Sequence, residues 1–240
     1  DYDKREAAGI EPARAYIDEI RNLASFEEYA SKIADFELAG KPTYFPFGVA
    51  PDFMDARINV LWADGPGTIL PDTTYYAEDH PQKADLLAKW RKTQEDLLAK
   101  FDFAEEEIKD LLDKVLELDA VFAQYVLSSE ESSEYAKLYH PYKWDDFKAL
   151  VPELPLADIF TKLIGQEPDQ VIVPEERFWQ AAKDIYTSAN WDKLHALLIL
   201  SAVRNTTPYL TDDIRVLAGA YHRALSGTPQ AQDKKKAAFY

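Results

Sequence analysis

The chain of 240 residues contains no cysteine. This absence excludes disulfide bonds, thiolate metal ligands and cysteine nucleophiles. Long apolar runs are also missing, because the longest, around 194–203, is interrupted by His195 and Ser201 and is shorter than the roughly 20 residues that span a bilayer. No stretch is rich in glycine and serine like a linker, so we predict one domain over residues 1–240.

Positive charge is scarce. Lysine and arginine total 27 against 43 acidic residues, which gives a net charge of -16. Such a surface repels phosphate backbones and anionic lipids, so we expect neither nucleic acid nor membrane among the partners. The compartment stays open, with the cytoplasm favoured because this stretch contains no signal peptide and no transmembrane segment.

The sequence also lacks catalytic motifs. A helical zinc peptidase site needs two histidines four residues apart with a glutamate between them. The four histidines, His80, His140, His195 and His222, are all more than five residues from one another. We therefore assign no catalytic, metal-binding or cofactor-binding residue to this chain. A site built from distant histidines, or an enzyme with a non-motif carboxylate site, remains a minor alternative.

What the sequence does contain is helical periodicity. The apolar fraction of 47% suits a globular protein with a large core. Apolar residues recur at helical spacing between capping and stop signals in nine segments. The predicted helices cover residues 10–23, 26–39, 81–101, 103–126, 144–150, 156–164, 175–188, 191–204 and 212–225.

Three of these predictions are specific. The helices 81–101 and 103–126 are joined by almost no linker, so we predict an antiparallel helical hairpin with Asp102 as the cap of its second helix. The helix 191–204 is apolar on most sides and should lie in the core. Residues 128–133 are polar and are predicted to form a loop.

Residues 43–63 have a different pattern. An aromatic run from Tyr44 to Val49 is interrupted by Pro46, and Ile58, Val60 and Trp62 then alternate with neighbours in a strand-like way. The two runs could pair as a small antiparallel ribbon, and 171–173 could form a brief strand. The predicted fold class is therefore mostly α, a multi-helix domain with helical hairpins and a small ribbon.

Both ends of the chain look cut. Residue 1 is Asp rather than Met, and residues 233–240 are typical of the opening of a helix with no stop signal after it. We therefore expect a chain that is truncated at both ends.

Between the ribbon and the hairpin lies a proline and aromatic segment, Gly65 to Tyr76. Its pattern G-x-x-L-P-x-x-x-Y-Y resembles a segment in the N-terminal domain of neprilysin-like zinc endopeptidases. Two further stretches, 171–174 with 191–204 and then 217–227, are similar to that family in the same order. The likeness extends over essentially the whole chain and is closest to the bacterial oligopeptidases of the PepO type.

The resemblance implies a non-catalytic helical lobe that faces a catalytic domain across a closed chamber. The family's H-E-x-x-H motif, its downstream glutamate ligand and its N-A-Y/F segment match nothing here, so no functional residue carries over. Zinc is expected in the catalytic domain of the parent, not in this fragment, which should be inactive alone. The implied partners are an oligopeptide substrate and the catalytic domain of the same parent chain.

A rival interpretation is a free-standing acidic α-helical module that binds peptides or other proteins. The aromatic fraction of 13% favours it, since aromatics with polar tips can line a peptide-binding cavity. The two hypotheses differ in whether the gene encodes more polypeptide after residue 240. An isolated lobe should expose apolar surface, so we also expect weak self-association or marginal stability.

Overall fold

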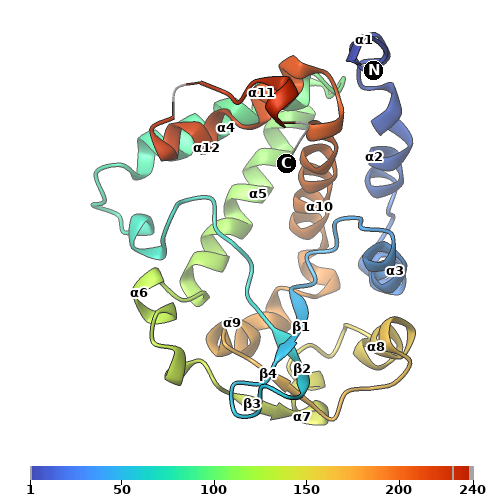
Figure 1. The fold of residues 1–240 in the computed structure, drawn as a ribbon, viewed down its shortest axis with the longest axis vertical. Coiled ribbons are helices and arrows are strands. Elements are labelled where there is room, and N and C mark those ends of the chain that lie inside the picture. Colours follow the sequence, from blue (N-terminus) through green and yellow to red (C-terminus); the bar gives the residue numbers. More distant parts are fainter. Residues whose placement is uncertain (1, 229, 238–240) are drawn as a thin grey trace.

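The computed structural model describes residues 2–228 and 230–237, and helices dominate it (Figure 1). The helical fold class is confirmed. The helices are α1 (Tyr2–Ala8), α2 (Arg14–Arg21), α3 (Phe26–Leu38), α4 (Lys83–Ala99), α5 (Glu105–Tyr125), α6 (Ser129–Ser132), α7 (Trp144–Lys148), α8 (Leu156–Ile164), α9 (Glu176–Ala181), α10 (Trp191–Thr206), α11 (Asp212–Ala218), α12 (Ala220–Ser226) and α13 (Lys234–Ala237).

The centre of the fold is α10, which packs against both α5 and α2. Its side chains Leu194, Leu198 and Val203 are at most 1% exposed, so the prediction that this helix lies in the core is confirmed. The predicted hairpin is confirmed as well, because α4 and α5 pack against each other (Figure 1). Burying these apolar faces removes them from water, which is the main stabilising contribution in such a bundle.

A small sheet closes the lower end of the helices as drawn in Figure 1. The predicted ribbon is confirmed: β1 (Phe47–Pro51) and β2 (Asn59–Ala63) pair antiparallel, with Phe47 opposite Ala63. The predicted strand near 171–173 is β4 (Gln170–Ile172), which lies parallel to β2. The sheet has the order β1-β2-β4-β3. The sequence did not predict β3 (Pro141–Lys143), because three residues beginning with proline carry too short a pattern.

An aromatic cluster, defined here as Phe47, Phe147, Phe160, Trp179 and Tyr186, packs beside this sheet. The Trp179 side chain is fully buried, and its ring stacks on Tyr186 with the ring centroids 5.9 Å apart. The Trp179 indole N–H donates to the carbonyl oxygens of Ala63 (3.2 Å) and Asp64 (2.9 Å). This residue therefore fastens α9 to the end of β2.

Several helix boundaries differ from those predicted. Residues 128–133 are not a loop but contain α6, which Ser128 caps through the N–H of Glu131. Asp102 is not the cap of α5, because it adopts a left-handed conformation (φ 61°) in the turn and pairs with Arg14 at 2.7 Å. The N-cap of α5 is Ala104, whose side chain makes no capping bond.

Two predicted helices are shorter than expected. The segment 175–188 is helical as α9 only to Ala181, and a 3-10 turn follows it. The segment 212–225 divides at Gly219 into α11 and α12. A Cβ at Gly219 would lie 2.7 Å from the Arg223 guanidinium, which donates to the carbonyl of Val216. The side chain of Arg223 thus occupies the space beside the break.

The C-terminal prediction is partly covered by the structure. Residues 234–237 form α13, in agreement with a helix opening there, and 238–240 lie outside the described residues. Among the residues that the structure describes, no helix is both long and apolar enough to cross a membrane.

Candidate functional site

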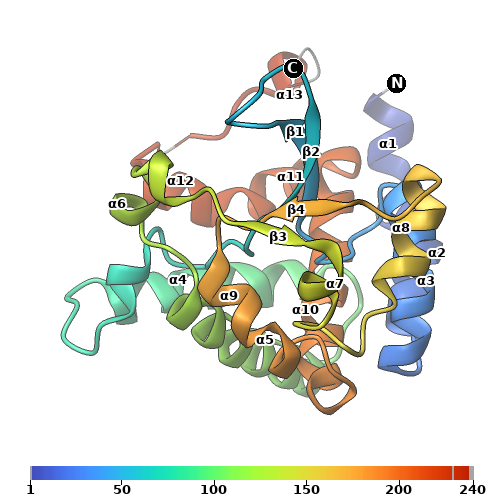
Figure 2. The same ribbon diagram turned by 90° about the horizontal axis from the view of Figure 1, so that it is seen from below.

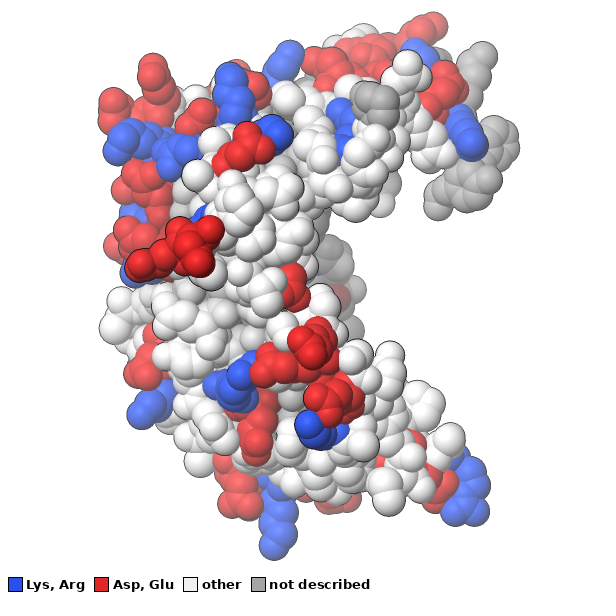
Figure 3. Space-filling model, turned by 90° about the vertical axis from the view of Figure 1, so that its left-hand side faces the viewer, with Lys and Arg blue, Asp and Glu red and all other residues white. Residues whose placement is uncertain are grey.

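One face of the molecule is hollow. Figure 2 shows the β1–β2 hairpin and α13 projecting to the same side of the helical body. The space-filling view of Figure 3 shows a deep concavity on one side, between an upper and a lower arm. The hairpin carries exposed apolar side chains, at Val49 in the middle of β1 and at Phe53, Met54 and Ile58 in the turn between the strands. The uncovered lobe surface and the self-association expected from the sequence both stay predictions.

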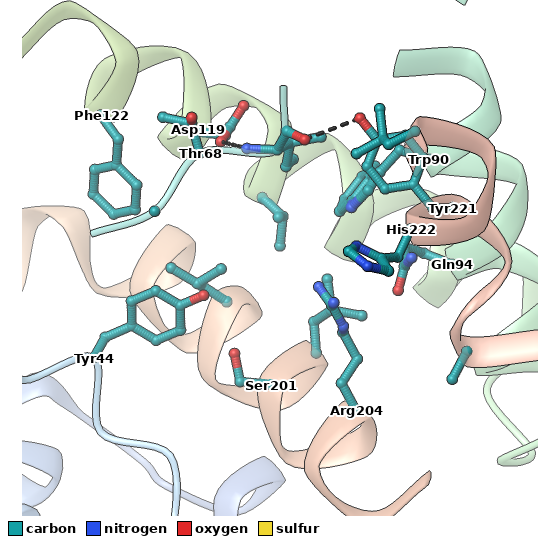
Figure 4. A pocket seen from close by; sticks show the side chains of 17 residues that line it. Tyr44, Thr68, Trp90, Gln94, Asp119, Phe122, Ser201, Arg204, Tyr221 and His222 are labelled. Atoms are coloured by element: carbon teal, nitrogen blue, oxygen red, sulfur yellow. Dashed lines mark hydrogen bonds between the residues drawn. The ribbon is translucent and has the colours of Figure 1, made fainter. Parts of the chain in front are cut away.

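A pocket of about 360 Å³ lies between α4, α5, α10, α12 and the segment 67–69 (Figure 4). Polar side chains from all four helices reach it, although the walls also contain leucine, valine and phenylalanine. The polar and aromatic residues that matter for the argument are Tyr44, Gln94, Asp119, Ser201, Arg204 and His222.

Asp119 of α5 is hydrogen-bonded to the segment 67–69 at the rim of the pocket. Its carboxylate accepts a hydrogen bond from the backbone N–H of Ile69 (2.7 Å) and another from the hydroxyl of Tyr76. The Tyr76 hydroxyl in turn accepts from the N–H of Leu70 (3.1 Å), and Tyr221 of α12 donates to the Ile69 carbonyl (2.9 Å). The bonds from Ile69 to Asp119 and to Tyr221 are the dashed lines of Figure 4.

These bonds explain the proline and aromatic segment in physical terms. Leu70 is buried, and the Tyr76 hydroxyl donates to the same Asp119 carboxylate that accepts a hydrogen bond from the N–H of Ile69. Burial raises the pKa of Asp119 to about 6, although the bonds from Tyr76 and Ile69 oppose this shift. Burial and the neighbouring carboxylate both raise the pKa of Tyr76. The segment 65–76 is therefore hydrogen-bonded to both α5 and α12, through Asp119 and Tyr221, and is called the clasp below.

Sequence reasoning missed Asp119. The signal was nevertheless present, because Asp119 falls between Val115 and Phe122 on the apolar face of its helix. A carboxylate at a core position needs hydrogen-bond partners, since an unpaired buried charge is costly. The position of the partners, far earlier in the chain around Ile69, could not be read from the sequence.

Tyr44, which lines the pocket, has an unusual backbone conformation. Its φ of 47° lies in the left-handed region, and its carbonyl accepts a hydrogen bond from the hydroxyl of Tyr186 (2.6 Å). It is not part of the ribbon, because β1 begins at Phe47. The Tyr44 ring points into the pocket (Figure 4), where burial raises its pKa and the nearby Ser201 and Arg204 oppose that effect.

Two polar groups in the pocket have no partner among the residues that the structure describes. Gln94 is 2% exposed, and its Oε1 atom has no hydrogen-bond donor within the described part of the chain. Arg204 extends from α10 toward His222 (Figure 4) and makes no ion pair with any described residue. A buried acceptor without a donor near an exposed, unpaired guanidinium makes this pocket a candidate binding site.

The four histidines do not come together. His195 is half-buried, with Nε2 2.8 Å from the carbonyl of Ile20, and burial lowers its pKa. His140 Nδ1 lies 3.2 Å from the carbonyl of Val173, His80 packs against the tilted ring of Tyr75, and His222 is exposed at the pocket. Over residues 2–228 and 230–237, no three histidine, cysteine or acidic side chains are grouped so that they could hold a metal ion.

The sequence matches Peptidase family M13 over residues 1–240. The "Putative zinc metalloproteinase in scaA 5′ region" of Streptococcus gordonii is 96% identical over 240 residues, covering all of this chain and 43% of that protein. A neutral endopeptidase of Lactococcus lactis subsp. cremoris is 34% identical over 237 residues, covering 98% of this chain and 38% of that protein. The chain thus spans well under half the length of these relatives.

Solved structures agree. The crystal structure of PepO from Lactobacillus rhamnosis aligns with a TM-score of 0.91 at 27% identity, over 100% of this chain and 38% of that one. The Mycobacterium tuberculosis zinc metalloprotease Zmp1 in its open state aligns with a TM-score of 0.85 at 18% identity, over 99% of this chain and 37% of that one. The second likeness concerns the fold alone.

Proposed function

Because the chain belongs to peptidase family M13 and forms its N-terminal domain, we propose that it is the non-catalytic helical lobe of a zinc metalloendopeptidase that hydrolyses oligopeptides. The names of the two bacterial relatives, a zinc metalloproteinase and a neutral endopeptidase, support this reaction class. The reaction itself would occur in the remainder of a longer chain, of which these residues are one part.

The residues described here do not fit a catalytic zinc site, because the histidines lie apart and no group of ligands converges. In the proposed parent, zinc would activate a water molecule for attack on the peptide carbonyl. This lobe would contribute the opposite wall of the substrate chamber. A chamber of that kind admits short peptides and excludes folded proteins by size.

The observation that carries the chamber role is the hollow face of Figure 3. The exposed apolar residues at the hairpin tip, among them Met54 at 77% exposure, are suited to contact with a neighbouring domain. The pocket beside the clasp adds polar groups that can bind a peptide.

The experiment compares the full-length natural protein that contains this chain with the 240 residues alone. We expect the full-length protein to bind stoichiometric zinc, measured by elemental analysis, and to cleave quenched-fluorescent peptides but not a folded protein that contains the same cleavage sequence. The isolated 240 residues should do neither. Hydrolysis or stoichiometric zinc in the isolated chain would overturn the proposal.

The unpaired groups of the pocket also suit the rival function, a peptide-binding module without catalysis. The gene distinguishes the two. A reading frame that continues past Tyr240 into an H-E-x-x-H motif supports the peptidase, and a stop codon there supports the module.

A further inference from the structure

We propose that the pocket between α4, α5, α10 and α12 binds a carboxylate next to an amide N–H, as at the C-terminus of a peptide, with Arg204 as the group that recognises the charge. The inference rests on the proposed function in that it assigns a peptide-binding subsite to the lobe. It makes a separate claim, however, because carboxylate binding can be measured without any peptide cleavage.

The first argument is the state of Arg204. In a chain with 43 acidic residues, arginines find partners readily, and Arg21, Arg91 and Arg177 each lie within 2.9 Å of a carboxylate oxygen. Arg204 is exposed at the pocket and forms no such pair with a described residue. A guanidinium offers a planar fork of donors that matches a carboxylate, so this arginine is available for an anionic ligand.

The surroundings of Arg204 favour a negative ligand. Ser201 and Tyr44 present hydroxyl groups to the same pocket, and His222 lies at its edge. The one carboxylate among the lining residues, Asp119, is already bound to the Ile69 N–H and the Tyr76 hydroxyl. Arg215, which lines the adjoining depression, is held by Asp212 at 2.7 Å. Arg204 is therefore the arginine left to bind an incoming charge.

The second argument is Gln94. Its Oε1 atom is buried in the pocket wall without a donor from the described residues, and a ligand that brings an N–H or O–H group can supply the missing hydrogen bond. A simple anion such as acetate supplies no such donor. A peptide terminus does, because an amide N–H stands next to its carboxylate. A volume of about 360 Å³ is adequate for one or two terminal residues.

The carboxylate could come from a free peptide or from an acidic side chain in the remainder of the longer protein. The probe is N-acetyl-Ala-Ala with a free carboxylate, compared with its C-terminal amide, which has the same shape without the charge. Binding is measured by calorimetry and by the change in tryptophan fluorescence, to which Trp90 in the pocket wall contributes. The full-length natural protein is titrated first and the 240-residue chain second.

For the wild-type chain we expect the acid to bind at least about tenfold more tightly than the amide, because the amide cannot form the charge-assisted hydrogen bond with Arg204. The variant R204Q should lose this preference, while the control R57Q, which alters an exposed arginine of the hairpin, should keep it. The variant Q94M should weaken binding of the acid without lowering the melting temperature, which separates ligand binding from folding.

The two sources give different results. If free peptides are the ligand, the full-length protein binds the acid and R204Q abolishes that binding. If an internal carboxylate fills the pocket, only the 240-residue chain binds the acid, and R204Q lowers the melting temperature of the full-length protein more than R57Q does. Equal binding of acid and amide, or acid binding that R204Q leaves unchanged, would overturn the inference. So would the absence of acid binding to both proteins. A full-length protein that binds the acid but cleaves no peptide would instead count against the proposed function alone.

Discussion

The aromatic cluster beside the sheet and the pocket beside the clasp differ in whether their polar groups have hydrogen-bond partners. In the aromatic cluster, the Trp179 N–H reaches two carbonyls and the Tyr186 hydroxyl donates to Tyr44. In the pocket, a buried amide oxygen of Gln94 and the guanidinium of Arg204 have no protein partner within the described residues. Gln94 is buried and Arg204 is exposed at the pocket, so these groups mark the pocket, and not the aromatic cluster, as the candidate binding site.

The largest effect is expected in the aromatic cluster. Replacing Trp179 by alanine removes a fully buried ring together with its two hydrogen bonds and leaves a cavity. We expect the free energy of unfolding to fall by about 3–5 kcal/mol, as measured by urea denaturation. W179F, which keeps most of the ring volume, should cost less. An alanine variant within about 1 kcal/mol of the wild type would contradict the structural role of this cluster.

The next effect concerns pH and the clasp. The pKa of Asp119 is about 6 in the folded chain against an ordinary value of 3.8, so the folded chain holds this proton more tightly than the unfolded chain. Its contribution to stability is therefore complete below about pH 4 and is lost as the pH rises through 6.

The variant D119N removes this titration. Between pH 4 and 7, the wild type should lose up to about 3 kcal/mol of unfolding free energy relative to D119N. Chemical denaturation at several pH values measures this difference. The other carboxylates are common to both proteins. If the difference in unfolding free energy between wild type and D119N stays constant with pH, the pKa of Asp119 is not raised in the folded chain.

A smaller effect isolates one hydrogen bond of the clasp. Y76F removes the hydroxyl that donates to Asp119 and accepts from Leu70, and should cost about 1–2 kcal/mol. The adjacent Tyr75 provides a matched control, because its ring packs against His80 and no described residue forms a hydrogen bond with its hydroxyl. Thermal melts should place Y75F close to the wild type. Equal losses in the two variants would mean that the clasp bond contributes nothing specific.

The smallest effect has the opposite sign. Q94M replaces an amide whose buried Oε1 atom has no donor among the described residues by an apolar group of similar size, so the free energy of unfolding should rise by about 1 kcal/mol. The neighbouring Thr93, whose hydroxyl is bonded to the Lys89 carbonyl, is the control, and T93V should bring no gain. A loss of stability in Q94M would show that its amide is already satisfied.

The fold was predictable where the signal is local. The apolar periodicity of α10 and the alternation in β2 identify both elements, because each pattern is complete within one segment. The clasp and the pocket were not predictable in the same way. Ile69, Asp119 and Tyr221 meet only because the chain returns twice to one place. Their residue types are visible in the sequence, but their proximity is a property of the tertiary structure.

The pairing of β2 with β4 has a consequence for how the chain acquires this structure. Leu61 lies beside Val171, so the sheet cannot be completed until the chain has left the ribosome at least as far as residue 172. Closing so long a loop is entropically costly, and such non-local contacts slow folding. During that interval the hairpin stands with one edge uncovered, a state that favours aggregation. A nascent chain of this kind would gain from protection by a chaperone before residue 170 emerges.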